Sequence, residues 1–208
     1  MKILAALAAI IALHFAFALP HNASAAMPDA WAESYRLEIA GQYIAAIKAL
    51  APVLQKYPRH EFAHLRLGWL NYLQGNHNDA IEEYKIALTI NSKSLDARLG
   101  ATLPLLAQQR WREAAFYARQ VIEVEPWNYY AHIRLMICEE AEGQWEALQK
   151  HASDVTLRYP SDATIQVYLA RALARLGLDR QAQVVYEQIL ERIPRHLEAT
   201  QFLEKNAR

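Results

Sequence analysis

The sequence predicts an all-α protein, an α-solenoid of five helix-turn-helix repeats closed by one C-terminal helix. The prediction rests on three residue series that share one period of 34 residues and one phase. Each series has a single gap, filled by Gln109, Ser92 and Leu148 respectively. The series are Gly41, Gly75, Gly143 and Gly177; Pro58, Pro126, Pro160 and Pro194; and Ala46, Ala80, Ala114 and Ala182.

Counting from Met27, the period gives five units and a tail: 27–60, 61–94, 95–128, 129–162, 163–196 and 197–208. We expect the first helix of each unit to end near its glycine, because glycine readily adopts the left-handed conformation at a helix terminus. The second helix is expected to end before the proline, which cannot continue it. The alanine is expected where two helices cross closely. The tail, with Leu197, Phe202 and Leu203, is expected to form a capping helix on the last unit.

The residues that fill these units are similar to those of a known family. Unit two has Leu67-Gly68, Gly75, Ala80, Tyr84, Ala87 and Leu88, and unit five has Leu169-Ala170, Gly177, Ala182, Tyr186 and Pro194. Unit three contributes Trp111, Ala114 and Pro126, and unit four contributes Leu135, Gly143, Trp145 and Pro160. This pattern resembles the tetratricopeptide-repeat family. The resemblance implies a right-handed superhelix whose first helices line a concave face, with Trp111 and Trp145 as packing residues.

Two features depart from the family pattern. Glu33 and Ser34 stand where the family has leucine and glycine, which we attribute to a terminal unit whose outer face meets water. Pro104 lies in the middle of a predicted helix and removes one backbone hydrogen bond. We therefore expect a local bend at 100–104, either as tolerated variation or as a feature that shapes the groove.

The first 26 residues differ in composition from the rest. Lys2 precedes an almost wholly apolar stretch, 3–19, and Pro20 interrupts it before an Ala-x-Ala exit. This order predicts a secretory signal peptide, 1–26, cleaved after Ala25 or Ala26. The alternative is an uncleaved N-terminal membrane anchor, but the apolar stretch is short for one and His14 interrupts it. A leader with one lysine and no arginine favours a bacterial, periplasmic protein without stable membrane insertion after cleavage.

Charge and cysteine content exclude some classes of protein. The 22 lysine and arginine residues balance 22 aspartate and glutamate residues, so the basic excess of a nucleic-acid-binding protein is missing. Cys138 is the only cysteine and cannot form an internal disulfide. It falls where the repeat family prefers alanine, which favours a buried, structural residue over one that pairs with a partner chain.

The resemblance also implies where a ligand binds. In the family, contacts come from positions 2, 5, 9, 12 and 13 of each unit. In this chain these positions form a mostly aromatic and aliphatic groove that turns cationic only in unit five. We predict a partner-binding groove of Trp31, Tyr35, Phe62, Leu65, Trp69, Tyr72, Leu99, Leu103, Tyr130, Ile133, Ile137, Arg171 and Arg175, with Glu38, Ile39, Asp96 and Glu140 at the same register.

A large apolar groove on a soluble protein indicates a binding site for another protein. We expect a non-catalytic adaptor in envelope assembly or export that binds an apolar or amphipathic segment, with Arg171 and Arg175 meeting an acidic end. Alternatively, the groove side chains pack on one another as core, or a second copy fills the groove in a homo-oligomer. A carboxylate clamp of the chaperone-binding type is improbable, because of its five positions (Leu65, Trp69, Gly100, Tyr130 and Arg134) only Arg134 matches.

Candidate residues for chemistry are few. His60 and His64 have a spacing that metal sites use, but His60 falls in a predicted turn and no third ligand is near it in the sequence. His64 and His132 share one repeat position, which favours a packing role. Glu139 stands where the family has a half-buried tyrosine, and the sequence gives no reason for it. We expect no metal, no cofactor and no catalytic residue; a metal-dependent or catalytic protein remains the weaker alternative.

Overall fold

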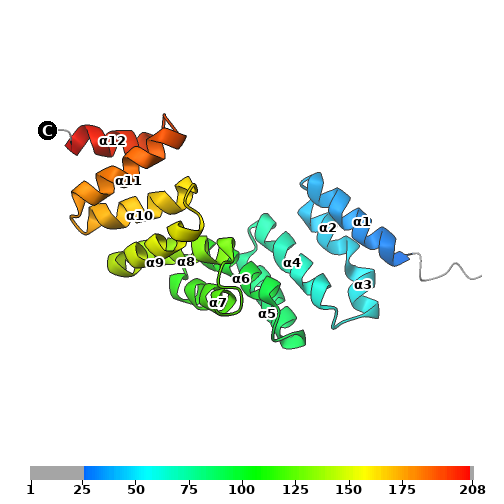
Figure 1. Cartoon of the computed structure of the whole chain (residues 1–208). Coiled ribbons are helices and arrows are strands. Elements are labelled where there is room, and N and C mark those ends of the chain that lie inside the picture. The colour runs from blue at the N-terminus through cyan, green and yellow to red at the C-terminus, as the bar shows by residue number, and fades with distance from the viewer. Residues whose placement is uncertain (1–25, 207–208) are drawn as a thin grey trace, which may run out of the picture.

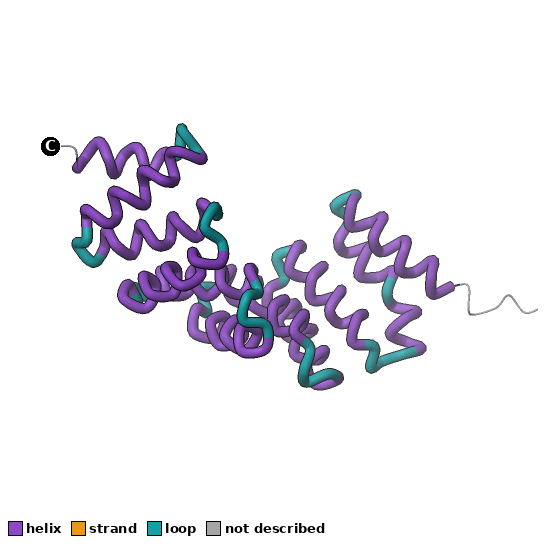
Figure 2. The backbone as a smooth tube through the Cα atoms, viewed as in Figure 1, coloured by secondary structure: helices purple, strands orange, loops and turns teal. Residues whose placement is uncertain are grey.

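The computed structural model describes residues 26–206 and consists of helices joined by short loops throughout that range (Figures 1 and 2). The predicted all-α solenoid is confirmed. The helices are α1 (Ala26–Ile39), α2 (Tyr43–Ala49), α3 (Ala51–Lys56), α4 (Glu61–Gln74), α5 (His77–Ile90), α6 (Leu95–Ala107), α7 (Trp111–Val124), α8 (Tyr129–Ala141), α9 (Trp145–Arg158), α10 (Ala163–Arg175), α11 (Asp179–Arg192) and α12 (Leu197–Asn206). The predicted signal peptide lies outside the described residues, apart from Ala26. Between residues 26 and 206, no helix has the length and apolar character needed to cross a membrane.

Each predicted unit holds one helical hairpin. In the first hairpin the second helix is interrupted at Leu50, so that α2 and α3 together take the place of one helix. Pro52 lies in the first turn of α3, where its missing N–H needs no partner within the helix. Five hairpins and the closing helix α12 therefore account for all twelve helices of the described chain.

The hairpins follow one another along a curved path from α1 to α12 (Figure 1). The first helices of neighbouring hairpins contact one another, α4 with α6, α6 with α8, and α8 with α10. The second helices α5, α7, α9 and α11 contact the helices before and after them instead. The first helices therefore lie on the inner side of the curve, where the predicted groove residues are.

The turn inside each hairpin needs a left-handed residue. Gly41, Gly75, Gly143 and Gly177 all have positive φ, between 67° and 86°. In the third hairpin Gln109 takes this place with φ 57°, and no other non-glycine residue of the described chain has positive φ. The gap in the glycine series thus marks a change of residue and not a change of turn.

Replacing Gln109 with glycine is expected to raise the free energy of unfolding by about 1 kcal/mol, because a left-handed conformation strains a residue with a Cβ by about that much. Urea unfolding of the two proteins measures the difference. Gly75→Gln is the reverse control: a Cβ there would meet nothing within 4 Å, so any loss comes from the backbone alone. A Gln109→Gly protein no more stable than the wild type would contradict the prediction.

Two further residues repeat on the period and join each hairpin to the next. The side chains of Ser94, Asn128 and Asp162 cap the first helices by accepting a backbone N–H, and His60 and His196 do the same through Nδ1. Four residues later, a long polar side chain donates to the carbonyl six residues before it. These donors are His64 to Pro58, Arg98 to Ser92, His132 to Pro126, and Gln166 to Pro160.

Glu139 belongs to a hydrogen-bonded chain between α8 and α9. His132 donates through Nε2 to the Pro126 carbonyl (2.9 Å), so its Nδ1 is free to accept from His151 Nε2 (2.8 Å). His151 Nδ1 lies 2.8 Å from the carboxylate of Glu139, which is buried. The acid at this position, unexplained by the sequence, thus satisfies the far end of a histidine pair. A second proton on His132 would place two N–H groups face to face and break the chain.

Acid is therefore expected to weaken the fold through His132. Burial lowers the pKa of His132 and the nearby His151 lowers it further, whereas the Pro126 carbonyl and Glu139 oppose them. Because the folded pKa lies below the unfolded value of about 6.5, this contribution is complete above that pH and is lost as the pH falls toward the folded pKa. Urea unfolding at neutral pH and at a pH about two units lower measures the loss.

The matched control for this prediction comes from the chain itself. Gln166 makes the same carbonyl contact one unit later without titrating, so His132→Gln keeps a donor for Pro126 and an acceptor for His151. The wild type is expected to lose more stability on acidification than His132→Gln. Equal losses would assign the acid sensitivity to other groups.

The remaining fold predictions have mixed outcomes. Phe202 and Leu203 of α12 pack on the last hairpin, with the Phe202 ring 4.6 Å from that of Tyr186, but Leu197 is exposed and does not contribute. Helix α6 continues through Pro104, and the bend at 100–104 stays a prediction. Ser34 contradicts its interpretation as a water-facing residue, because it is fully buried. Cys138 is buried as expected, and burial raises the pKa of its thiol to about 12.

Candidate partner-binding pocket

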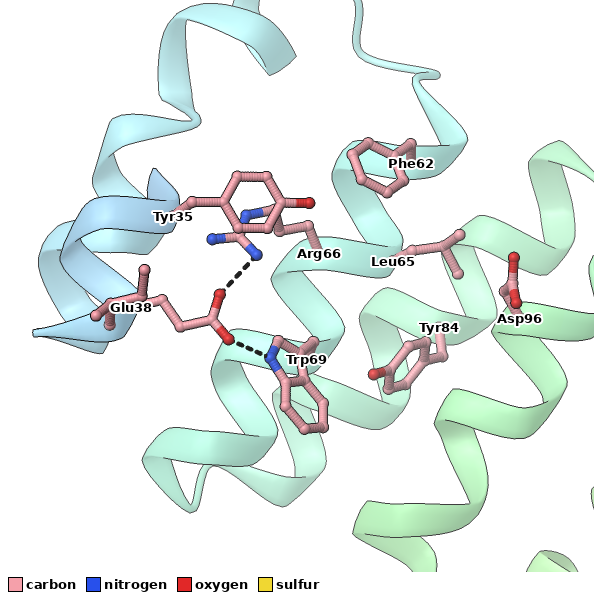
Figure 3. Close-up of a pocket in the computed structure, with 9 residues that line it drawn as sticks. Tyr35, Glu38, Phe62, Leu65, Arg66, Trp69, Tyr84 and Asp96 are labelled. Atoms are coloured by element: carbon pink, nitrogen blue, oxygen red, sulfur yellow. Dashed lines mark hydrogen bonds and ion pairs between the residues drawn. The ribbon is translucent and has the colours of Figure 1, made fainter. Parts of the chain in front are cut away.

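The inner side of the first three hairpins contains a pocket of about 480 Å³ (Figure 3). It lies between α1, α4 and α6 and brings together four of the predicted groove residues. Its lining is Tyr35, Glu38 and Ile39 from α1; Phe62, Leu65, Arg66 and Trp69 from α4; Tyr84 from α5; and Asp96 from α6.

Helical spacing explains why these side chains meet. Phe62, Leu65, Arg66 and Trp69 are separated by three, one and three residues, which places them along one face of α4. Tyr35, Glu38 and Ile39 have the same relation on α1. The two stripes face each other across the groove, with Asp96 on α6 at the far side (Figure 3).

A network of charged and polar groups fixes one wall of the pocket. The carboxylate of Glu38 accepts from Arg66 Nη1 at 2.7 Å and from the Trp69 indole Nε1–H at 2.6 Å. Arg66 also donates through Nε to Ser34 Oγ at 2.9 Å, and its guanidinium lies 3.6 Å from the centre of the Tyr35 ring. These contacts fix Tyr35 and Trp69 before any ligand arrives, which lowers the entropy lost on binding.

Tyr84 forms the floor of the pocket. Its ring lies between Gly68 on α4 and Gly100 on α6, where a Cβ would come within 2.9 Å and 2.3 Å of it respectively. Figure 3 shows its hydroxyl directed toward Trp69. Burial raises the pKa of Tyr84 far above its usual value, so the hydroxyl stays neutral and able to donate.

The other predicted groove residues extend from this pocket in both directions. The Trp31 ring lies 5.2 Å from Phe62, and the Tyr72 ring lies 5.8 Å from Trp69. Tyr130 on α8 is 63% exposed. The four aliphatic residues of the central groove, Leu99, Leu103, Ile133 and Ile137, are half-buried. The inner surface is therefore partly packed and partly open, with its exposed aromatic rings at Tyr35, Phe62 and Tyr130.

The two arginines predicted to meet an acidic end lie apart from the pocket. Arg171 donates to Glu198 on α12 and to Glu140 on α8. The hydrogen bond to Glu198 and the charge of Glu140 raise the pKa of Arg171 against its partial burial. Arg175 is exposed and lies 5.2 Å from the centre of the Trp145 ring. Two carboxylates of the chain itself therefore already balance the charge of Arg171.

The weaker candidates from the sequence have structural partners. Arg134, the one clamp residue that matched, donates to the Leu99 carbonyl and to Thr102 Oγ1. His60 Nδ1 caps α4, and the two ring nitrogens of His64 contact Glu83 and Pro58. Within residues 26–206, no three histidine, cysteine, aspartate or glutamate side chains lie together as metal ligands would. Trp111 and Trp145 pack against buried clusters, as the resemblance implied.

Sequence reasoning missed Arg66, Ser34 and Tyr84 as parts of this site. A signal for the first two was present in the sequence. Arg66 and Arg134 are 68 residues apart, and so are their hydroxyl partners Ser34 and Thr102. A double period in charged residues was therefore visible, but only the structure shows that each arginine reaches back to the hairpin before it.

Comparisons with known proteins agree on the fold. No family model and no curated protein matches this sequence. Among solved structures, the MamA protein superposes with a TM-score of 0.73 at 18% identity, over 88% of this chain and 95% of MamA. YrrB, described as a TPR protein with an unusual peptide-binding site, gives 0.72 at 16% identity over 85% and 90%.

A tetratricopeptide repeat protein from Parabacteroides merdae gives a TM-score of 0.77 at 13% identity, over 86% of this chain and 71% of that protein. At these identities the likeness concerns the fold. It agrees with the resemblance carried by the repeat residues, and the chain has the tetratricopeptide-repeat fold.

Proposed function

We propose that this tetratricopeptide-repeat protein is a non-catalytic scaffold that binds an apolar or amphipathic segment of another protein on its inner face. The observation that carries the proposal is the pocket between α1, α4 and α6, where partly exposed aromatic rings stand on a hydrogen-bonded wall. Tyr35 and Phe62 are 44% and 47% exposed, and such rings supply much of the binding energy at protein interfaces. The peptide-binding site that the description of YrrB names supports the same use of this fold.

The proposed setting is the periplasm, in an envelope assembly or export process. Its support is the N-terminal sequence, with Lys2, the apolar stretch and the Ala-x-Ala exit. Cell fractionation with N-terminal sequencing tests it: a periplasmic chain that begins at Ala26 or Met27 is expected. A chain that retains residues 1–25 in the membrane fraction would favour the anchored alternative.

Photo-crosslinking tests the binding face. Benzoylphenylalanine in place of Phe62 is expected to capture a partner in cells, whereas the same group in place of Leu157, which is 83% exposed on the outer helix α9, is not. The captured partner should be lost when Trp69→Ala and Tyr130→Ala are added, with thermal melting to show that the protein is folded. Phe116→Ala, on the outer helix α7, is the matched control and should not affect capture.

The same experiment separates a partner from self-association. Crosslinks between two copies in the purified protein would indicate that the groove takes a second copy. Equal capture from Phe62 and Leu157, or capture that survives the double substitution, would place the contact outside the groove and contradict the proposal.

A further inference from the structure

The charge around the pocket is not that expected of a site for an acidic segment. Its one cation, Arg66, has a side chain only 4% exposed, and it is already paired with Glu38 and covered by the Tyr35 ring. Asp96 stands exposed at the opposite side of the pocket, and no basic side chain of the described residues lies within 4.0 Å of its carboxylate. With the Arg66–Glu38 pair neutral as a unit, the pocket carries a net negative charge.

The pocket also has acceptors that the fold does not use up. Glu38 accepts two hydrogen bonds, whereas a carboxylate offers about four acceptor positions, and its side chain is 21% exposed. Phe62, Trp69 and Tyr84 contribute further aromatic rings to the lining. Aromatic faces attract ammonium and guanidinium groups, and the fold itself places the Arg66 guanidinium on Tyr35.

These observations identify the chemistry of the occupant. We propose that the pocket binds a lysine or arginine side chain of the partner, flanked by apolar residues that cover Phe62, Leu65 and Ile39. The cationic group lies between Asp96 and the free acceptor positions of Glu38, and its aliphatic stem lies along the aromatic rings. This inference rests on the proposed function and specifies the partner segment for this pocket.

An acidic side chain is the wrong occupant here for two reasons. It would approach Asp96 and Glu38 with like charge, and Arg66 cannot turn toward it without leaving Glu38 behind in a half-buried position. At the other end of the groove, Glu140 and Glu198 already bind Arg171. The earlier expectation of an acidic end in the partner therefore finds no support at the pocket.

The test uses capped six-residue peptides, Gly-Leu-Phe-Xaa-Leu-Gly, with arginine, glutamine or glutamate at Xaa. The readout is the indole N–H signal of Trp69 in a two-dimensional spectrum of isotope-labelled protein, assigned with Trp69→Phe. This N–H donates to Glu38, so its position responds to a cation beside that carboxylate. We expect the arginine peptide to bind about fivefold more tightly than the glutamine peptide, the difference typical of one partly exposed charge pair. The glutamate peptide should bind more weakly than both.

Two variants locate the charge that makes the difference. Asp96→Asn should bring the arginine and glutamine peptides to within about twofold of each other. Asp154→Asn, an exposed aspartate on the outer helix α9, should leave the preference unchanged. A preference that survives Asp96→Asn would overturn the assignment of Asp96.

Each remaining outcome also decides. If glutamine and arginine peptides bind equally, or glutamate binds best, the inference fails while the scaffold proposal stands. If no peptide moves the Trp69 signal, the pocket does not take a basic side chain. In that case, capture from Phe62 in the crosslinking experiment decides separately whether the groove binds any partner.

Discussion

Replacing Glu38 with alanine is expected to lower the free energy of unfolding by about 3 kcal/mol, because it leaves the buried guanidinium of Arg66 without its carboxylate. Arg66 would keep only Ser34 as a side-chain hydrogen-bond acceptor, and the indole N–H of Trp69 would lose its acceptor as well. In a protein of this size such a loss lowers the melting temperature by roughly 6–12 °C.

The control for this prediction lies on the same helix. Glu33 also pairs with an arginine, Arg36, but both side chains are exposed, so Glu33→Ala should leave the melting temperature within error of the wild type. A second control replaces both charges, Glu38→Leu with Arg66→Met, and should recover most of the loss because no unpaired charge remains. If Glu38→Ala melts like Glu33→Ala, Arg66 is not held by its carboxylate.

The repeat architecture could be predicted because its determinants are local and recur. A glycine at the hairpin turn and a proline after the second helix act within a few residues, and each is seen four times. The exception is just as informative: Gln109 keeps the left-handed turn because the packing of the two helices requires it. The same reasoning did not reveal the capping side chains at residues 60, 94, 128, 162 and 196, because four residue types share that task.

The candidate site could be predicted only in part, because it depends on contacts between hairpins. The register of α4 placed Phe62, Leu65 and Trp69 on one face, and the structure brings them into the pocket with Tyr35. Ser34 was wrongly assigned to a water-facing surface because its partner, Arg66, lies 32 residues away in the sequence. Arg171 was read as a free cation for the same reason, since Glu140 and Glu198 approach it from two other helices.

Gly100→Ala is expected to destabilise the protein by about 1–3 kcal/mol, even though alanine favours a helix over glycine by about 1 kcal/mol. The added Cβ would lie 2.3 Å from Cε1 of Tyr84. The ring cannot move away, because Gly68 on the opposite side leaves only 2.9 Å for a Cβ of its own. Backbone displacement between α4 and α6 is the remaining way to relieve the clash, and it would alter the pocket that these helices form.

Substitutions at Tyr84 separate this clash from other effects in urea unfolding. The clashing atoms belong to the ring, so Tyr84→Phe should not rescue Gly100→Ala, whereas Tyr84→Leu removes the ring and should make the second substitution nearly neutral. The double substitution is then less destabilising than the sum of its parts, the sign expected of residues in direct contact. Additive losses would mean that α6 shifts freely, and the floor of the pocket would then be adaptable instead of fixed. A rigid floor favours one occupant of defined size, so this cycle also bears on how selective the pocket is for its partner.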